Sequence, residues 1–266
     1  MAKKIEKIVL PVAGIGKRLQ PLTLTTPKNL IPLAGKPILE YALDEARAAG
    51  LNEVILIISP QHVAQYEEYL KAARAKYPEL NFRSRVQQEP LGHGHAILQA
   101  ADLIRGEPFL MRFCDDIILG GEPTLAKLMD LYYKTGRAAV LLARGPKEEI
   151  MRYGVVVGEP VPGQKGVHRI TNVVEKPPAD KVPSELYVVG GYALGPEILE
   201  NLIGASQKME QKADALPVYA GIDVEFNKGL PIYGWEFTGD RLDCGTLEGL
   251  DKAEQYMKNR PLKTND

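Results

Sequence analysis

The stretch LPVAGIGKRLQPLTLTTPKNLIPLAGKP, from Leu10 to Pro37, decides how this chain begins its fold. It holds three glycines, five prolines and four basic residues. Glycine permits left-handed backbone, and proline lacks the N–H group that helices and strands use. The composition therefore predicts a long loop that joins a buried strand at 8–13 to a helix at about 37–49, with Pro37 in the first helical turn.

Outward from this loop, apolar runs and amphipathic segments alternate as far as residue 144. The run VILIIS (54–59) is apolar throughout, which is typical of a parallel strand covered on both faces. The alternation predicts an α/β fold with a Rossmann-like, doubly wound, mostly parallel sheet flanked by helices. We expect further strands at 82–87, 108–116 and 138–144, and further helices at 61–76, 93–104 and 125–135.

Beyond Gly145 the segments are shorter and rich in valine and glycine. They predict an additional mixed or antiparallel portion, with strands at 154–158, 168–177, 185–194 and 232–237. Two weaker helices are expected at 196–203 and 211–219. The last segment, DRLDCGTLEGLDKAEQYMKN (240–259), predicts a turn followed by an amphipathic helix. No repeat or low-complexity linker divides the sequence, so we expect one domain over residues 1–266.

The bulk composition excludes several classes of protein. The 266 residues carry a formal net charge of −1, and no polybasic segment argues for nucleic acid or an anionic membrane as a partner. No apolar stretch approaches the roughly 18 residues of a membrane span. The apolar run after the basic N-terminus breaks at Pro11, too early for a signal peptide. Two cysteines do not make a disulfide framework, and we expect a cytoplasmic protein.

The glycines and cations of the opening loop are suited to phosphate. Gly14 and Gly16 let backbone N–H groups approach a ligand, and consecutive N–H groups form an anion-binding concavity. Arg18 and Lys28 add positive charge near the carboxyl end of the first strand, where doubly wound sheets bind ligands. The loop lacks the full GxxxxGK[ST] and GxGxxG patterns. On the loop alone, an ordinary surface loop explains the residues equally well.

Longer segments carry a resemblance. AGIGKRLQPLTLTTPKNLIPLAGKPILEYAL (13–43) resembles the signature of the sugar-phosphate nucleotidylyltransferases, and is most similar to the bacterial UTP–glucose-1-phosphate uridylyltransferases, or UDP-glucose pyrophosphorylases. Segments similar to that family follow in order along nearly the whole chain: VQQEPLGHGHAIL, FCDDIILGGE, YGVVVGE, TNVVEKP, VVGGYALGPEI and DRLDCGTLEGLDKA. One glycine-rich loop would be weak, but this ordered series is specific.

The resemblance implies a reaction and a division of labour. The sugar phosphate of glucose 1-phosphate would attack the α-phosphorus of UTP in line, releasing pyrophosphate and forming UDP-glucose, with Mg²⁺ as cofactor. Residues 1–145 would form the nucleotide-binding half, and residues 146–266 the sugar-binding half with the C-terminal helix. Small-molecule substrates would be the partners. We also expect a homo-oligomer, a dimer or tetramer, although nothing in the sequence counts subunits.

The same resemblance assigns the phosphate and metal residues. Arg18 and Lys28 are the catalytic pair, which hold the triphosphate and reach the reacting phosphates. Asp115 and Asp243 are the metal pair, since Mg²⁺ favours a few carboxylates together with phosphates and water. One shared ion requires the two carboxylates to lie within about 8 Å of each other. Asp116 is better explained as a turn cap.

Base and sugar residues follow from the remaining segments. In the resemblance, Gln87 reads the uracil edge, because a carboxamide both donates and accepts. Glu175 and Lys176 are neighbours on a strand, so both reach one ligand only where the strand ends, and Pro177 supplies that end. The expected nucleotide-binding residues are Ala13, Gly14, Gln87 and Gly92. The expected sugar-phosphate-binding residues are Gly154, Glu175, Lys176 and Gly190.

The remaining histidines, cysteines and lysine of these segments are interpreted as residues without a catalytic or binding role. His93 and His95 form an HxH pattern, but on a helix residues two apart do not share a face, so we interpret them as structural or surface residues. Cys114 and Cys244 adjoin the two metal acids; packing beneath the acids is favoured over a soft-metal site. Lys17, where relatives carry threonine, is interpreted as a solvated side chain.

Departures from the family pattern leave the substrate preference open. They include Asn29, Gly191 and the region around Asp214, and none removes a proposed phosphate or metal residue. The alternatives are a thymidylyltransferase, a uridylyltransferase for another hexose 1-phosphate, and a non-catalytic nucleotide-sugar sensor. A dinucleotide oxidoreductase is disfavoured, because the third glycine and the acid about twenty residues further on are missing.

Overall fold

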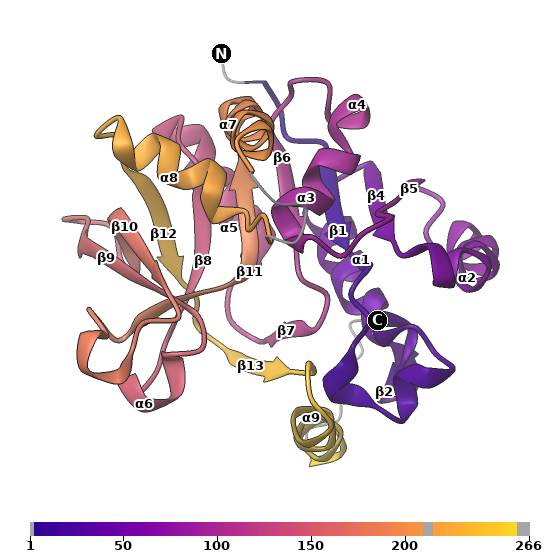
Figure 1. Cartoon of the computed structure of the whole chain (residues 1–266). Coiled ribbons are helices and arrows are strands. Elements are labelled where there is room, and N and C mark those ends of the chain that lie inside the picture. Colours follow the sequence, from indigo (N-terminus) through magenta and orange to yellow (C-terminus); the bar gives the residue numbers. More distant parts are fainter. Residues whose placement is uncertain (1–2, 210–214, 260–266) are drawn as a thin grey trace.

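The computed structural model describes residues 3–209 and 215–259 and shows a mixed sheet with helices packed on both faces (Figure 1). Over the described residues the main sheet has nine strands in the order β5-β4-β1-β6-β11-β8-β12-β10-β9. The strands are β1 (Lys7–Pro11), β4 (Glu53–Ile58), β5 (Asn81–Val86), β6 (Phe109–Arg112), β8 (Ala139–Arg144), β9 (Gly154–Pro160), β10 (Val167–Glu175), β11 (Leu186–Leu194) and β12 (Ile232–Glu236). The α/β prediction is confirmed.

Alternate residues of the central strands pack against helices on opposite faces of the sheet. Both faces of each strand are therefore buried, so the sequence of the strand is apolar throughout. Ile8 and Leu10 of β1 belong to one hydrophobic cluster, and Val9 belongs to the other. The first cluster includes residues of α1 (Ile38–Ala48), α2 (Val63–Lys76), α5 (Thr124–Thr135) and α9 (Leu247–Asn259). The second includes residues of α3 (Gly92–Gln99), α4 (Ala101–Ile104), α7 (Pro196–Gln207) and α8 (Tyr219–Asn227). This is the doubly wound arrangement.

The parallel part of the sheet is smaller than the sequence predicts. The neighbours β5, β4, β1 and β6 pair in parallel, but β11 lies antiparallel between β6 and β8. The pair β8–β12 is parallel again, while β10 is antiparallel to both β12 and β9. The mixed portion expected beyond Gly145 is therefore a continuation of the same sheet. The short helix α6 (Lys147–Ile150) precedes it.

A small two-stranded ribbon replaces two predicted features. The apolar segment expected as one strand at 108–116 breaks after Arg112, and Asp116–Leu119 forms a separate strand, β7. The segment Asp240–Asp243, expected as a turn, is strand β13 and pairs antiparallel with β7. This pairing sets Asp243 opposite Asp116. Residues 127 positions apart thus meet beneath the main sheet, where Figure 1 shows β7 and β13 running together.

The prediction of a helix at 211–219 is wrong for residues 215–218. Residues 211–214, including Asp214, lie outside the described residues. The described residues 215–218 are not helical, and α8 begins only at Tyr219. Pro217 has no N–H group for a helical hydrogen bond. The backbone of Leu216 bonds to the start of α3 instead. Its carbonyl accepts from the Gly94 N–H at 2.8 Å, and its N–H donates to the carbonyl of Leu91 at 2.7 Å.

The opening loop is a built structure. It winds through three short 3-10 helices, η1 (Lys17–Leu19), η2 (Leu22–Leu24) and η3 (Lys28–Leu30), and then the hairpin of β2 (Pro32–Leu33) and β3 (Lys36–Pro37). Gly16 adopts φ +68°, and a β-carbon there would lie 2.9 Å from Thr23 Cγ2. The Thr23 hydroxyl donates to the Gly16 carbonyl at 2.9 Å. These contacts hold Arg18 and Lys28 on ordered backbone. A further short helix, η4 (Pro60–His62), precedes α2, and η5 (Ala179–Lys181) follows β10.

Of the helices that the structure describes, none is both long and apolar enough to cross a membrane.

Candidate functional site

A cleft of about 410 Å³ brings together residues from both halves of the chain. It opens where β6 ends, against the starts of β9 and α8, the end of β10 and the middle of β11. It is lined by Arg18, His93, Phe113, Asp115, Asp116, Arg152, Tyr153, Gly154, Glu175, Lys176, Val188, Gly190, Tyr192, Tyr219 and Asp243. Seven of the residues predicted from the sequence are in this lining: Arg18, Asp115, Gly154, Glu175, Lys176, Gly190 and Asp243.

A larger groove, of about 690 Å³, lies between α5 and β12 and contains none of the predicted residues. Two of its lysines are already paired there, Lys127 with Glu122 and Lys134 with Asp130. Its volume alone therefore does not indicate function, and we place the candidate site in the smaller cleft.

Three charged side chains converge at Gly245. A β-carbon added to this glycine would lie 2.9 Å from Asp243 Oδ1, 3.1 Å from Asp115 Oδ2 and 3.3 Å from Arg18 Nη2. Since both oxygens lie so near one point, they are no more than about 6.0 Å apart. The two carboxylates therefore meet the limit of about 8 Å set above, and an ion at about 2.1 Å from each oxygen would hold the two oxygens within about 4.2 Å of each other. Glycine is needed here because any side chain would fill the space among these groups.

Lys28 lies on the same group of charges. Its Nζ contacts Asp115 Oδ2 at 2.5 Å, and the two side chains are 15% and 23% exposed. Arg18 is exposed, and no carboxylate forms an ion pair with it within residues 3–209 and 215–259. We refer to Arg18, Lys28, Asp115 and Asp243 as the charged rim. It combines two cations and two anions, of which Arg18, Asp115 and Asp243 line the cleft and Lys28 is paired with Asp115.

Asp243 is held in its ionised form by several donors. Tyr153 donates its hydroxyl to Oδ2 at 3.0 Å, and the Gly245 N–H donates to Oδ1 at 2.9 Å. Burial alone would raise the pKa of this carboxyl, but the Gly245 N–H, the Arg241 charge and the Tyr153 hydroxyl lower the pKa below its ordinary value. A carboxylate of this kind is suited to bind a cation.

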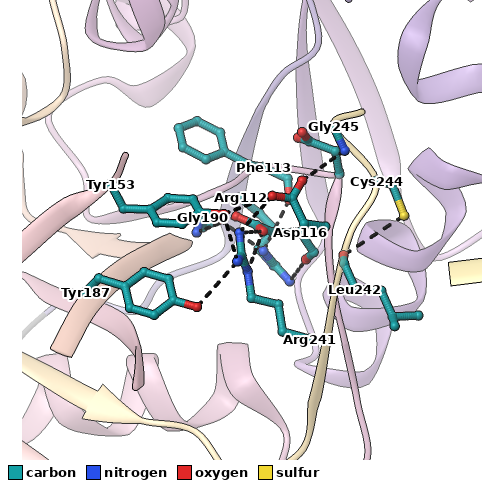
Figure 2. A network of polar contacts seen from close by, with 12 residues as sticks. Arg112, Phe113, Asp116, Tyr153, Tyr187, Gly190, Arg241, Leu242, Cys244 and Gly245 are labelled. Atoms are coloured by element: carbon teal, nitrogen blue, oxygen red, sulfur yellow. Dashed lines mark hydrogen bonds and ion pairs between the residues drawn. The ribbon is translucent and has the colours of Figure 1, made fainter. Parts of the chain in front are cut away.

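Asp116, next to Asp115 in the chain, belongs to a different set of contacts (Figure 2). Its side chain is buried, and Oδ1 accepts from Arg241 Nε at 2.7 Å. Its Oδ2 accepts from the backbone N–H of Gly190 at 3.1 Å. Both carboxylate oxygens therefore have donors within the protein. Asp116 links Arg241 to the backbone of β11, whereas the sequence predicted only a turn cap.

Arg241 and Arg112 complete this buried set, which we call the clamp (Arg112, Asp116 and Arg241). Burial alone would lower the pKa of Arg241, but the charge of Asp116 and the neighbouring tyrosines raise the pKa well above its ordinary value. Its guanidinium lies 4.9 Å from the ring centre of Tyr153 and 5.7 Å from that of Tyr187, and these two rings stack on each other.

Arg112, only 1% exposed, fixes the turn that carries Asp115. It donates to the carbonyls of Phe113 and Gly190 at 3.2 Å each, and also to the carbonyl of Asp116. Its Nε donates to Glu45 Oε2 at 2.9 Å, which supplies the compensating charge. Figure 2 shows Arg112 beside Phe113, Gly190 and Asp116. The clamp thereby fixes the backbone on which the charged rim stands.

Another part of the cleft lining combines a carboxylate, an ammonium and two closely packed glycines. Strand β10 ends at Glu175, and Lys176 turns into the left-handed region at φ +47°. Both side chains then line one cleft, as the sequence predicted for a strand end. A β-carbon on Gly154 would lie 2.8 Å from the Tyr219 hydroxyl, and one on Gly190 would lie 2.5 Å from Phe113 Cβ. Larger residues at these two positions would therefore collide with the cleft wall.

The four predicted nucleotide-binding residues are not in the lining of this cleft. Ala13 and Gly14 follow β1, while Gln87 follows β5 and precedes Gly92 at the start of α3. Gln87 is buried, and its amide donates to the Gly92 carbonyl at 3.0 Å and meets His95 Nδ1 at 2.9 Å. His95 therefore contacts Gln87, and its interpretation as a structural or surface residue stays a prediction. Base recognition by these four residues stays a prediction.

Several cleft residues escaped the sequence analysis. Tyr153 lines the cleft and Arg241 holds Asp116 beside it. They adjoin residues that were singled out, Gly154 and Asp243, but an ordinary tyrosine or arginine carries no signal of its own. Phe113, Tyr192 and Tyr219 form a wall of the cleft by ring contacts, together with His93, which the sequence analysis had interpreted only as a structural or surface residue. Only the tertiary structure joins them.

The donor set for a metal is small. No cluster of three or more His, Cys, Asp or Glu side chains arranged to hold an ion occurs in the described part of the chain. Cys114 and Cys244 are both buried beneath the acids, and burial raises the pKa of each thiol to about 12. Neutral thiols are poor metal ligands, which agrees with a packing role. Asp115 and Asp243 would hold an ion only together with ligand oxygens.

Comparison with known proteins shows that this chain has relatives that match it over nearly its whole length. The model of the nucleotidyl transferase family matches residues 7–260. The UTP–glucose-1-phosphate uridylyltransferase of Pseudomonas aeruginosa is 31% identical, and the alignment covers 98% of each chain. The protein of the same name from Bacillus subtilis is also 31% identical, over 98% of this chain and 94% of its own length.

Solved structures agree with these relatives. A UDP-glucose pyrophosphorylase in complex with UDP-glucose is 32% identical and superimposes with a TM-score of 0.84, covering 96% of this chain and 100% of the other. A UTP-bound UGPase from Acinetobacter baumannii is 25% identical, with a TM-score of 0.81 over 97% of this chain and 95% of the other.

Proposed function

Because this chain belongs to the nucleotidyl transferase family, we propose that it transfers the uridylyl group of UTP to glucose 1-phosphate, giving UDP-glucose and pyrophosphate. The observation that carries the proposal is the arrangement of the cleft. Arg18, Asp115 and Asp243 converge at Gly245, and Glu175 and Lys176 lie in the same lining. The cleft thus combines groups suited to a triphosphate with groups suited to a phosphorylated sugar.

The chain's own residues would act by position and charge. No nucleophilic side chain is required, because an oxygen of the sugar phosphate attacks the α-phosphorus in line and pyrophosphate leaves. Arg18, exposed at the cleft, would make two-point contact with triphosphate oxygens and stabilise the departing pyrophosphate. Lys28, held by Asp115, would neutralise charge at the reacting phosphates.

The sugar phosphate would be held from the end of β10. Lys176 would pair with its phosphate, and Glu175 would accept hydrogen bonds from ring hydroxyls. Gly154 and Gly190 line the same cleft, so the sugar would lie beside their backbone. We assign the nucleoside to Ala13, Gly14, Gln87 and Gly92, at the ends of β1 and β5.

We propose Mg²⁺ as the cofactor, held by Asp115 and Asp243. When bound, the ion supplies charge neutralisation between phosphate groups that repel each other. The distance of at most about 6.0 Å between the two carboxylate oxygens, and the lowered pKa of Asp243, both support this assignment. The carboxylates keep the site anionic, and Lys28 and Arg18 limit its net charge.

The test is pyrophosphate release with each of the four common nucleoside triphosphates and dTTP, combined with several hexose 1-phosphates. We expect UTP with glucose 1-phosphate to react fastest, and EDTA to abolish the reaction until Mg²⁺ is restored. A faster reaction with dTTP or another hexose would assign the protein to the neighbouring specificity. Absence of any turnover with Mg²⁺, while UTP still binds, would support a non-catalytic sensor.

Assembly and location are separate proposals. We propose a cytoplasmic homo-oligomer, a dimer or a tetramer, as the resemblance to this family suggests. Light scattering coupled to size exclusion measures the mass of the particle directly, and cell fractionation measures the location. A monomeric mass at working concentration would exclude the oligomer.

A further inference from the structure

His93 lies in the wall of the cleft, although its HxH pattern suggests only a structural or surface residue. It is the second residue of α3, and its half-buried ring packs edge-on against Phe113 with ring centres 5.1 Å apart. Phe113 in turn contacts Tyr192, and the Tyr192 and Tyr219 hydroxyls are 3.2 Å apart. The ring is therefore part of a rigid aromatic wall.

The backbone fixes which ring nitrogen carries the proton. The N–H of Val218 donates to His93 Nδ1 at 3.0 Å, so Nδ1 is an acceptor. A neutral imidazole that accepts at Nδ1 must carry its hydrogen at Nε2. Burial, with the nearby charge of Lys176, lowers the pKa of His93 to about 4, in agreement with a neutral ring.

The glycines beside His93 make this contact possible. A β-carbon on Gly92 would lie 2.7 Å from the carbonyl oxygen of Leu216, and one on Gly94 would lie 2.6 Å from that of Pro217. The segment 216–218 therefore packs directly on the backbone of α3. With Nδ1 occupied and the ring braced, Nε2–H is a donor of fixed direction. It has no hydrogen-bond partner among the residues that the structure describes.

We infer that His93 is a specificity-determining residue, which donates a hydrogen bond from Nε2 to one hydroxyl oxygen of the hexose. This inference rests on the proposed function. It deepens that function because the cleft then presents an acceptor-only group, Glu175, and a donor-only group, the fixed Nε2–H, to the same sugar. A hexose that lacks the matching hydroxyl leaves the Nε2–H unpaired and is rejected.

Three substitutions separate this role from a merely structural one. His93→Asn keeps an acceptor for the Val218 N–H but has no donor at the Nε2 position. His93→Gln places an amide donor near the Nε2 position. His93→Leu removes both functions, and melting temperatures show which variants keep the fold. A residue that only anchors segment 216–218 would tolerate Asn and would be damaged by Leu.

The experiment measures kcat/KM for glucose 1-phosphate and its 2-, 3-, 4- and 6-deoxy derivatives with the wild type and the three variants. We expect one deoxy derivative to lose about tenfold with the wild type. With His93→Asn, glucose 1-phosphate itself should lose about tenfold, and that one deoxy penalty should disappear. The other penalties and the KM for UTP should stay unchanged, and His93→Gln should recover part of the discrimination.

The failures are distinguishable. If the wild type converts UTP and glucose 1-phosphate but His93→Asn shows the same deoxy penalties as the wild type, this inference is overturned and the proposed function stands. A wild type with no turnover on this substrate pair overturns both. Loss of discrimination at all positions together, with a raised KM for UTP, would mean that the whole cleft had shifted, and would also overturn the inference.

Discussion

Asp115 and Asp116 are consecutive, yet they belong to electrostatic regions of opposite character. Asp115 stands in the charged rim, where it pairs with Lys28 and lines the cleft together with Arg18. Asp116 also borders the cleft, but it stands in the clamp, where Arg241 and the Gly190 N–H already satisfy its carboxylate. Charges that stay partly exposed in a cleft are available to ligands, whereas charges satisfied by protein donors position the backbone. Changes in the rim should therefore affect activity, and changes in the clamp should affect stability.

The clamp offers the largest expected effect. Arg241→Met leaves the buried Asp116 without its cation, and should lower the free energy of unfolding by about 3–5 kcal/mol. Chemical denaturation followed by circular dichroism measures this loss. The matched control is Lys134→Met on α5, whose exposed pair with Asp130 should be worth about 1 kcal/mol or less. Equal losses in the two variants would remove the distinction between buried and exposed pairs.

Substitutions in the charged rim should lower kcat and leave the stability of the protein unchanged. Arg18→Ala should lower kcat by about 100-fold or more, because a preorganised charge at the reacting phosphates is lost. The melting temperature should stay the same, since the side chain is exposed. Steady-state kinetics with both substrates measures the effect. Lys17→Ala, next to it and also exposed, is the control and should keep its turnover. A larger effect on the KM for sugar phosphate than on kcat would contradict the role of Arg18.

Gly190 joins the two regions, since its N–H bonds to the clamp and its α-carbon lines the cleft. Gly190→Ala would push a methyl group against Phe113 and should cost about 1–3 kcal/mol of stability. It should also raise the KM for the sugar phosphate. Gly204→Ala in α7 meets nothing within 4 Å and should be neutral or slightly stabilising. Thermal melts and kinetics of the two variants together test whether position, and not the added methyl group itself, decides the outcome.

Protonation of His93 in acid should lower the free energy of unfolding, by less than the loss expected for Arg241→Met. Its pKa is about 4 in the folded protein, below the ordinary 6.5, so protonation favours the unfolded chain. The stability from this group is complete above about pH 6.5 and is lost as pH falls toward about 4. Between pH 7 and pH 5 the wild type should lose about 1–2 kcal/mol more than His93→Asn. Urea denaturation at both pH values measures the difference, and parallel curves for the two proteins would contradict it.

Most of the elements and much of the site could be predicted from sequence, but in an uneven way. The strands at β1, β4, β6 and β8 follow from runs with apolar residues on both faces. The cleft residues Arg18, Glu175 and Lys176 follow from motifs at strand and loop ends. The ribbon β7–β13 could not be predicted, because Asp116–Leu119 and Asp240–Asp243 stabilise each other only as a pair. The start of α8 was missed because Leu216 bonds to the distant α3.

By itself the sequence determined the residue types: a glycine-rich loop with isolated cations, two separated acids beside cysteines, and a Glu-Lys pair before proline. Periodicity determined the doubly wound half, because side-chain burial on both faces of a strand leaves a local pattern. Only the tertiary structure decided that Asp115 stays partly exposed in the cleft while Asp116 is buried against Arg241, and that His93 has one free donor. Those outcomes depend on contacts between segments more than a hundred residues apart, such as Asp116 with Arg241 and His93 with Val218, and such contacts leave no periodic trace in the chain.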